Sequence, residues 1–250
     1  MSQSHSLITP RARLLSTALV ASLLWLYFVP YAASQRSLSR AERQAPADRS
    51  AAARLAAQQG KPCDLIFIGA SNVEFWATGG ETVWERYYAP RHALNYGVAG
   101  DTTHLCLRRL DNPGLLTLHP KVAVLFIGLN SRGDTPQQTA EGICAVAAKT
   151  KVIFPGVHVI VVSLTPNGRN DAEVVQTNRI VQAAAGEKDF AYLDLYSHLP
   201  RLGNNWLGLR GDSLHLNPHG YEIWAGQMEP LLQRLLPLDP PAASSLAAKR

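Results

Sequence analysis

Residues 64–72, DLIFIGASN, join a short run of apolar residues to a glycine turn and a serine. The run is short, apolar and closed by Gly69, so it predicts a buried strand. Runs of the same kind predict further strands at residues 93–96, 122–127, 157–164 and 190–195. Strands that are apolar nearly throughout are typical of a parallel sheet covered on both faces.

Helical patterns alternate with these strands along the chain. We expect helices at residues 81–88, 102–110, 135–154, 171–185 and 218–236. Thr135 and Pro136 are residue types that favour the first positions of a helix. The alternation predicts an α/β fold with one parallel sheet between helical layers. Ligands of such folds bind at the carboxyl ends of the strands, where we look for a site.

A serine, a histidine and an aspartate form the first candidate constellation. Ser71 comes two residues after Gly69, and a serine hydroxyl needs a neighbouring base to become a nucleophile. His215 and Asp212 share a loop before Pro218, so Asp212 can orient His215 as that base. Each has a structural alternative on its own, since Ser71 suits a helix N-cap and His215 an exposed loop.

Two further segments supply hydrogen-bond donors for an oxyanion. The side-chain amide of Asn130 follows the third predicted strand, and the backbone N–H groups of Gly100 and Ser71 complete a candidate oxyanion hole. Glycine and asparagine also favour turns, so neither decides the question alone. The presence of all four segments in this order favours a serine hydrolase.

Three residues near these segments are predicted to line the substrate pocket. They are Asn72, Trp76 and Trp206. Core or lid packing is an equally good interpretation of the two tryptophans, because large aromatic side chains are often buried.

The sequence does not favour a metal site. His219 lies four residues after His215, but a helix is expected to start between them at Pro218 and no third ligand stands out. The three cysteines, Cys63, Cys106 and Cys144, are odd in number and match no zinc spacing, so we expect buried free thiols.

The formal charge of +5 is confined to the N-terminal part of the chain. Residues 1–60 contain seven arginines, Glu42 and Asp48, whereas the rest has 17 basic and 17 acidic residues. The globular part is therefore neutral overall, and we expect no nucleic-acid partner.

Residues 1–34 have the pattern of an export signal. Arg11 and Arg13 precede an uncharged run at 14–29, and small residues follow at 32–34. A cleaved signal peptide, an uncleaved membrane anchor and a buried helix remain as interpretations. The first two predict an exported protein, periplasmic or extracellular, or one held at the membrane by this segment alone.

The remaining boundaries follow from composition. Residues 35–60, rich in Arg, Ala, Ser and Gln, are interpreted as a linker with some helical tendency. The globular domain is expected at 61–237, and residues 238–250 as a disordered tail.

These residues resemble the SGNH (GDSL-type) hydrolase family over residues 64–236. The stretch WERYYAPRHALNYGVAGDTT, residues 84–103, is especially similar to the catalytic subunits of intracellular platelet-activating-factor acetylhydrolases. The positions that match the family's site are Ser71, Gly100, Asn130, Asp212 and His215.

The resemblance implies a flavodoxin-like α/β/α sandwich with a five-stranded parallel sheet, and ester hydrolysis through an acyl-serine without a cofactor. Within the acetylhydrolase branch it implies short acyl groups such as acetyl, and a homodimer is one expectation. The chain departs from the family at Ala70, where an aspartate is usual, and has Ser131 where many relatives have aspartate.

The sequence therefore predicts a short-acyl serine esterase acting on a small ester or an acetylated glycan. The leader favours a substrate outside the cytoplasm, such as an acetylated polysaccharide or a lipid. Two alternatives stay open: an acyltransferase acting on a sugar or lipid, and a membrane-anchored binding module without activity.

Overall fold

The structure, a computed structural model, describes residues 46–168 and 171–238. The predicted leader and nearly all of the predicted tail lie outside these residues. Within the described part, no helix has the length and apolar character needed to cross a membrane.

The centre of the fold is a sheet of five parallel strands. Their order is β2-β1-β3-β4-β5, the flavodoxin order, in which the chain changes direction of travel between β1 and β3. The strands are β1 (Leu65–Gly69), β2 (Ala93–Gly97), β3 (Val122–Phe126), β4 (His158–Val162) and β5 (Ala191–Leu193). Every residue of β1 and β3 is buried, as expected for a sheet covered on both faces. All five predicted strands are confirmed.

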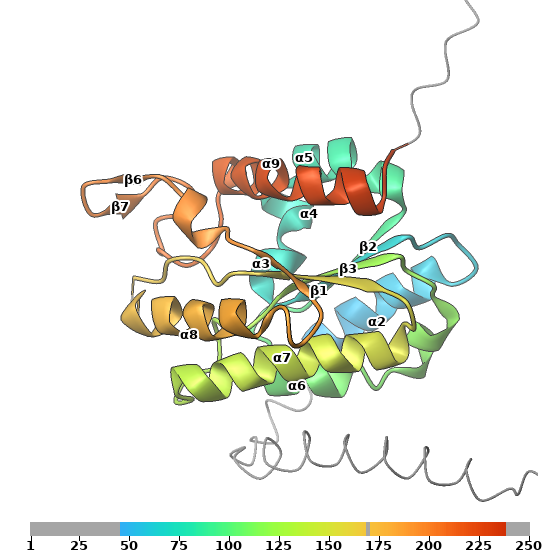
Figure 1. Cartoon of the computed structure of the whole chain (residues 1–250). Coiled ribbons are helices and arrows are strands. Elements are labelled where there is room, and N and C mark those ends of the chain that lie inside the picture. The colour runs from blue at the N-terminus through green and yellow to red at the C-terminus, as the bar shows by residue number, and fades with distance from the viewer. Residues whose placement is uncertain (1–45, 169–170, 239–250) are drawn as a thin grey trace, which may run out of the picture. The chain divides into compact units, whose positions relative to one another are not determined.

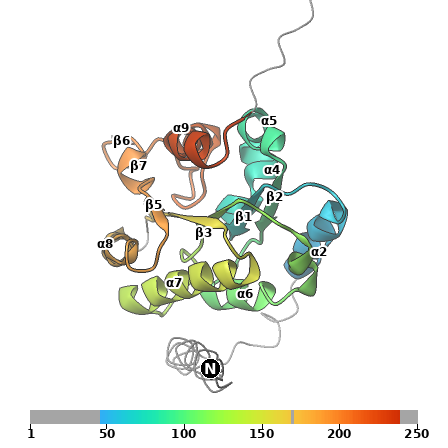
Figure 2. The ribbon, with the colours of Figure 1, turned by 45° about the vertical axis from the view of Figure 1, so that its right-hand side comes forward.

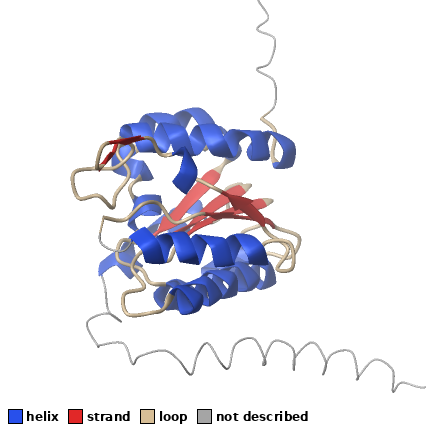
Figure 3. Cartoon of the chain, turned by 60° about the vertical axis from the view of Figure 1, so that its left-hand side comes forward, coloured by secondary structure: helices blue, strands red, loops and turns tan. Residues whose placement is uncertain are grey.

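Helices cover both faces of the sheet (Figures 1 and 2). One layer contains α2 (Pro46–Gln58), α6 (Thr103–Arg109), α7 (Pro136–Ile153) and α8 (Asp171–Ala184). The other contains α4 (Trp76–Gly79), α5 (Glu81–Tyr87) and α9 (Pro218–Leu235), with the short α3 (Ser71–Glu74) directly after β1. Figure 3 shows the sheet between the two layers, which confirms the predicted three-layer sandwich.

Short elements complete the described chain. They are the 3-10 turns η1 (Ala89–Arg91), η2 (Pro113–Thr117) and η3 (Tyr196–His198), and the hairpin of β6 (Arg201–Leu202) and β7 (Asn205–Trp206). Thr135 caps α7 and Pro136 is its first residue, as predicted. The three cysteines are unpaired as predicted, and Cys63 and Cys106 are buried, whereas Cys144 is partly exposed and not buried as expected.

An aromatic cluster fills the space between the sheet and the α4/α5/α9 layer. Trp76 lies at its centre and is fully buried. Its ring centroid is 4.3 Å from that of Tyr221, 4.9 Å from Trp224 and 6.1 Å from Phe67. The prediction that Trp76 lines the substrate pocket is therefore wrong, and the alternative of core packing is correct.

The helical tendency predicted for residues 35–60 is confirmed at Pro46–Gln58, which form α2, but this helix packs on the domain and is not a linker. Ala51 and Leu55 are buried, with exposed fractions of 0% and 3%, and the helix packs beside β2. The Arg54 guanidinium donates hydrogen bonds to two backbone carbonyls of β2. The helix is stabilised because Ala51 and Leu55 are buried and because Arg54 bonds the backbone carbonyls of β2. Its composition alone resembles a linker.

Candidate active site

Ser71 is the first residue of α3, immediately beyond the end of β1. The strand passes Gly69 at a point where a β-carbon would lie 2.2 Å from the carbonyl oxygen of Phe126, so no larger residue fits there. This close turn places the Ser71 hydroxyl at the carboxyl edge of the sheet. Its Oγ lies 2.9 Å from Nε2 of His215, although the two residues are 144 positions apart.

His215 lies on the loop that leads into α9, and Asp212 holds it from the same loop. Nδ1 of His215 is 2.6 Å from Oδ2 of Asp212. The other carboxylate oxygen, Oδ1, accepts from the backbone N–H groups of Leu214 and His215, each at 3.0 Å. Ser213 adopts a left-handed backbone with φ of 54°, which closes this turn around the carboxylate.

The surroundings of Asp212 favour its charged form. Partial burial works to raise the pKa of Asp212, but hydrogen bonds from the backbone and side chain of His215 and from the Leu214 N–H outweigh it and lower the pKa to about 2. An ionised carboxylate can only accept hydrogen bonds, so Nδ1 of His215 carries a proton. Nε2 is then left to accept from the Ser71 hydroxyl, which is the arrangement that activates a serine.

The candidate oxyanion donors lie on two neighbouring loops. Gly100 has φ of 84°, and no atom lies within 4 Å of where its β-carbon would be, so its backbone is open to a ligand. Nδ2 of Asn130 donates to the carbonyl oxygen of Asp101 at 3.1 Å, which brings the amide beside the Gly100 loop. Since Ser71 follows β1 and Asn130 follows β3, both flank the crevice where the chain reverses direction.

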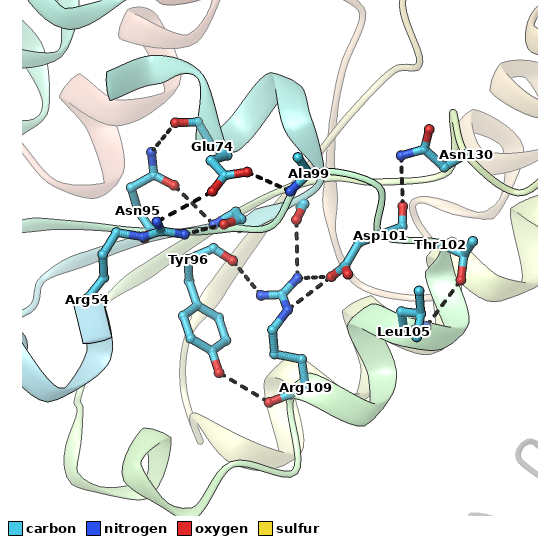
Figure 4. Close-up of polar contacts among 12 residues, drawn as sticks. Arg54, Glu74, Asn95, Tyr96, Ala99, Asp101, Thr102, Leu105, Arg109 and Asn130 are labelled. Carbon is cyan, nitrogen blue, oxygen red and sulfur yellow. Dashed lines mark hydrogen bonds and ion pairs between the residues drawn. The ribbon is translucent and has the colours of Figure 1, made fainter. Parts of the chain in front are cut away.

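Side chains on both sides fix the loop that carries Gly100 (Figure 4). Oε2 of Glu74 accepts from the Ala99 N–H at 2.7 Å. The Asp101 carboxylate pairs with the Arg109 guanidinium, and both side chains are at most 5% exposed. The residues immediately before and after Gly100 are therefore anchored, so its N–H is held in one direction.

Arg109 also ties this loop to the sheet. It donates to the backbone carbonyls of Tyr96 in β2 and Gly69 in β1. Sequence reasoning missed Glu74 and Arg109 as part of the site. Arg109 lies on the apolar face of a predicted helix. Charged side chains are rarely buried unless they are paired, so this position was a signal of a buried ion pair.

Two hollows lie at this edge of the sheet, and Ser71 lines the smaller one. The smaller hollow has a volume of about 10 Å³. The larger, of about 360 Å³, shares Asn130 and Leu214 with the smaller one. It extends past the exposed side chains of Arg132 and Glu173.

The other predicted pocket residues have different roles. Asn72 borders the small hollow, in keeping with its predicted place in the pocket, and its side chain also makes hydrogen bonds to the backbone of the loop that carries His215. Trp206 lies half-buried on β7, where its ring packs edge-on against Tyr196 and under the Arg201 guanidinium. The structure does not bring Trp206 into either hollow.

The described residues include no group of three His, Cys, Asp or Glu side chains placed to hold a metal ion. Nδ1 of His219 faces the Glu222 carboxylate at 3.5 Å on α9. His215 is instead engaged with Asp212 and Ser71.

Comparison with known proteins shows which family the chain belongs to. Residues 66–223 match the GDSL-like Lipase/Acylhydrolase family. The chain belongs to this family. This GDSL hydrolase is 33% identical over 187 residues to platelet-activating factor acetylhydrolase IB subunit alpha1 of Bos taurus, which covers 72% of the chain and 79% of the relative.

Solved structures agree on the fold of this GDSL hydrolase. A GDSL-like lipase from Bacteroides thetaiotaomicron aligns with a TM-score of 0.64 at 18% identity, covering 76% of this chain and 98% of that one. An acetylxylan esterase from Geobacillus stearothermophilus aligns with a TM-score of 0.53 at 18% identity, covering 68% and 93%. The resemblance inferred from sequence is confirmed, and membership of the family implies hydrolase activity.

Proposed function

We propose that the chain is a serine esterase that cleaves short-acyl carboxylic esters. The observation that carries the proposal is the hydrogen-bonded series from Asp212 through His215 to Ser71. In this mechanism Oγ of Ser71 attacks the ester carbonyl carbon while Nε2 of His215 takes the hydroxyl proton. His215 then gives that proton to the leaving alcohol, and the acyl group stays on Ser71.

A water molecule completes the cycle. His215 removes a proton from the water, whose oxygen attacks the acyl carbon, and the proton returns to Ser71 as the carboxylic acid leaves. In both steps the negative oxygen is held by the backbone N–H groups of Ser71 and Gly100 and by the Asn130 amide. Each such donor contributes about 3 kcal/mol to stabilisation of the transition state.

The size of the small hollow supports a short acyl group. Its volume of about 10 Å³ is close to the minimum that holds one water molecule, so it favours a small acyl group over a long one. Similar proteins include an acetylhydrolase subunit and an acetylxylan esterase, which also supports acetyl esters.

The larger hollow supports a polar alcohol half. Its rim carries Arg132, Asp134 and Glu173, which favour hydroxyl or charged groups over a long apolar chain. The sequence pattern of residues 1–34 supports an exported or membrane-anchored enzyme. We therefore infer an acetylated glycan, or another polar ester outside the cytoplasm, as the substrate class.

The test is hydrolysis of p-nitrophenyl esters from acetyl to octanoyl by the full chain, by Ser71→Ala and by Ser197→Ala. Ser197 is an exposed serine bound to Asp194 and serves as the matched control. We expect turnover by the wild type to fall as the acyl chain lengthens. Ser71→Ala is expected to lower turnover by about 10³-fold or more, and Ser197→Ala to leave it unchanged. Equal activity of Ser71→Ala would refute the mechanism.

The same assay separates the alternative functions. An added acceptor alcohol that yields a transfer product faster than hydrolysis would indicate an acyltransferase. A folded protein that binds acetylated oligosaccharides without turning them over would indicate a binding module.

A further inference from the structure

We propose that Asn72 is a positioning residue that sets the distance between the Ser71 nucleophile and the His215 base. The inference rests on the proposed esterase function, because it concerns the geometry of that reaction. Asn72 follows Ser71 directly in sequence, and its side chain is turned toward the loop that carries His215.

The Asn72 amide bonds the backbone on both sides of His215. Its Oδ1 accepts from the N–H of Leu216 at 2.9 Å. Its Nδ2 donates to the carbonyl oxygen of Leu214 at 3.3 Å. Asn72 is 4% exposed and Leu216 is fully buried, so little water is available to replace these bonds.

The loop's remaining bonds determine its shape. The Arg210 N–H donates to the carbonyl oxygen of His215 at 2.7 Å, and Nε of Arg210 donates to that of Leu216 at 3.0 Å. Both bonds, like those around Asp212, join residues of the same loop and give it its form. Two contacts come from outside the loop: the Gly168 N–H donates to the Ser213 carbonyl oxygen at 3.2 Å, and the Phe75 ring lies 5.1 Å from that of His215. Neither of them is a hydrogen bond between the loop and the helix that carries Ser71.

Asn72 constrains where the loop lies relative to Ser71. It sits beside the nucleophile in α3, and 142 to 144 residues separate it from its two partners. The Tyr221 hydroxyl, from α9, donates to the Asn72 backbone carbonyl at 3.0 Å and fixes the position of Asn72 itself. The two hydrogen bonds of the Asn72 side-chain amide thus hold His215 at a fixed position relative to α3.

Loss of this contact has a defined kinetic consequence. A shift of about 1 Å between reacting groups lowers a rate by about 10²-fold, whereas substrate binding depends on the pocket walls. We expect Asn72→Leu, which has a similar shape and no hydrogen-bonding groups, to lower kcat by about 10²-fold with KM changed by less than about 3-fold. Asn72→Ala removes the same hydrogen bonds and adds no apolar side chain. We expect it to lower kcat in the same way with KM little changed.

The matched control is Asn112→Ala. Asn112 caps η2, where its Oδ1 accepts from the Gly114 N–H at 2.9 Å, and it lies outside the site. We expect this variant to lower Tm while its kcat stays that of the wild type. A purely structural role of Asn72 predicts the same behaviour for its variants, with kcat per folded molecule unchanged, and that result would overturn the inference.

A measurement without substrate separates this inference from the proposed function. Nε2 of His215, which lies 2.9 Å from the Ser71 hydroxyl, is expected to give the same ¹⁵N resonance in the wild type and in Asn112→Ala. We expect this resonance to shift in Asn72→Leu and Asn72→Ala, because the distance from Nε2 to Ser71 changes while the bond to Asp212 stays within the loop. An inactive wild type would refute the esterase proposal, whereas an active wild type with unaltered kcat and resonance in both Asn72 variants would refute only the positioning role.

Discussion

Replacing Asp101 by asparagine is expected to lower the free energy of unfolding by about 3–5 kcal/mol. The side chains of Asp101 and Arg109 are only 5% and 4% exposed, so the Arg109 charge cannot find water when its partner becomes neutral. It keeps the carbonyl oxygens of Tyr96 and Gly69, which satisfy hydrogen bonds but do not balance the charge. The loss is a large fraction of the roughly 5–15 kcal/mol that stabilises a typical domain.

The assay is urea unfolding of the wild type, Asp101→Asn, Arg109→Met and the double variant. Because Arg109→Met together with Asp101→Asn removes both charges, the double variant is expected to be less destabilised than the sum of the two single ones. Activity is expected to fall as well, by up to about 10²- to 10³-fold, since Asp101 fixes one side of the Gly100 donor.

The control is Asp111→Asn, which breaks an ion pair with Lys149. The Asp111 side chain is 71% exposed, so its loss is expected to cost no more than about 1 kcal/mol. A cost below about 1 kcal/mol for Asp101→Asn as well, or strictly additive effects in the double variant, would refute the argument that burial makes this pair important.

Three further predictions concern the site and its support. Asn130→Ala is expected to lower kcat by about 10²- to 10³-fold with little change in KM, and a raised KM at unchanged kcat would instead assign Asn130 to ground-state binding. A chain that begins at residue 61 lacks α2 and should have a lower Tm than one that begins at residue 46, measured by calorimetry; equal midpoints would show that α2 is dispensable. Because hydrogen bonds lower the pKa of Asp212 to about 2, its contribution to stability is complete above the ordinary value of 3.8 and is lost as pH falls through about 2. The Tm difference between wild type and Asp212→Asn should therefore be constant near neutral pH and shrink between about pH 4 and pH 2, and a difference that does not change there would contradict the assigned pKa.

The strands were predictable because the same apolar residues favour a strand locally and are buried in the folded sheet. Each is a short apolar run, and glycine follows or ends the first three, at Gly69, Gly97 and Gly128. Burial on both faces of the sheet makes such a pattern unambiguous. The residues of the candidate site were predictable for a related reason, since Ser71 and Asn130 directly follow strands and the fold brings strand ends together.

Helix α2 was not predictable in the same way. Its sequence, PADRSAAARLAAQ, has Ala51 and Leu55 as its fully buried apolar residues and otherwise resembles a linker. Its attachment depends on Arg54 reaching carbonyl oxygens at the edge of β2, which is a contact between distant parts of the chain. No local pattern in the sequence encodes such a contact.

Nearness to Ser71 in sequence was informative for Asn72 but misleading for Trp76. Asn72 borders the small hollow and also bonds the loop of His215. Trp76, only five positions on, is fully buried in the aromatic cluster. Nearness to a nucleophile in sequence therefore did not by itself indicate whether a residue lines the pocket.

At this site the residues that hold the reacting groups differ from the residues that line the walls of the large hollow, and this affects how substrate preference can change. The side chains that hold the reacting groups in place are Asn72, Glu74 and Arg109, and none of them lines the large hollow. Walls such as Arg132 and Glu173 are exposed and lie on other segments. Selection for a new alcohol can change those walls while the reaction geometry is inherited intact, so libraries restricted to the walls offer a direct route to altered substrate preference.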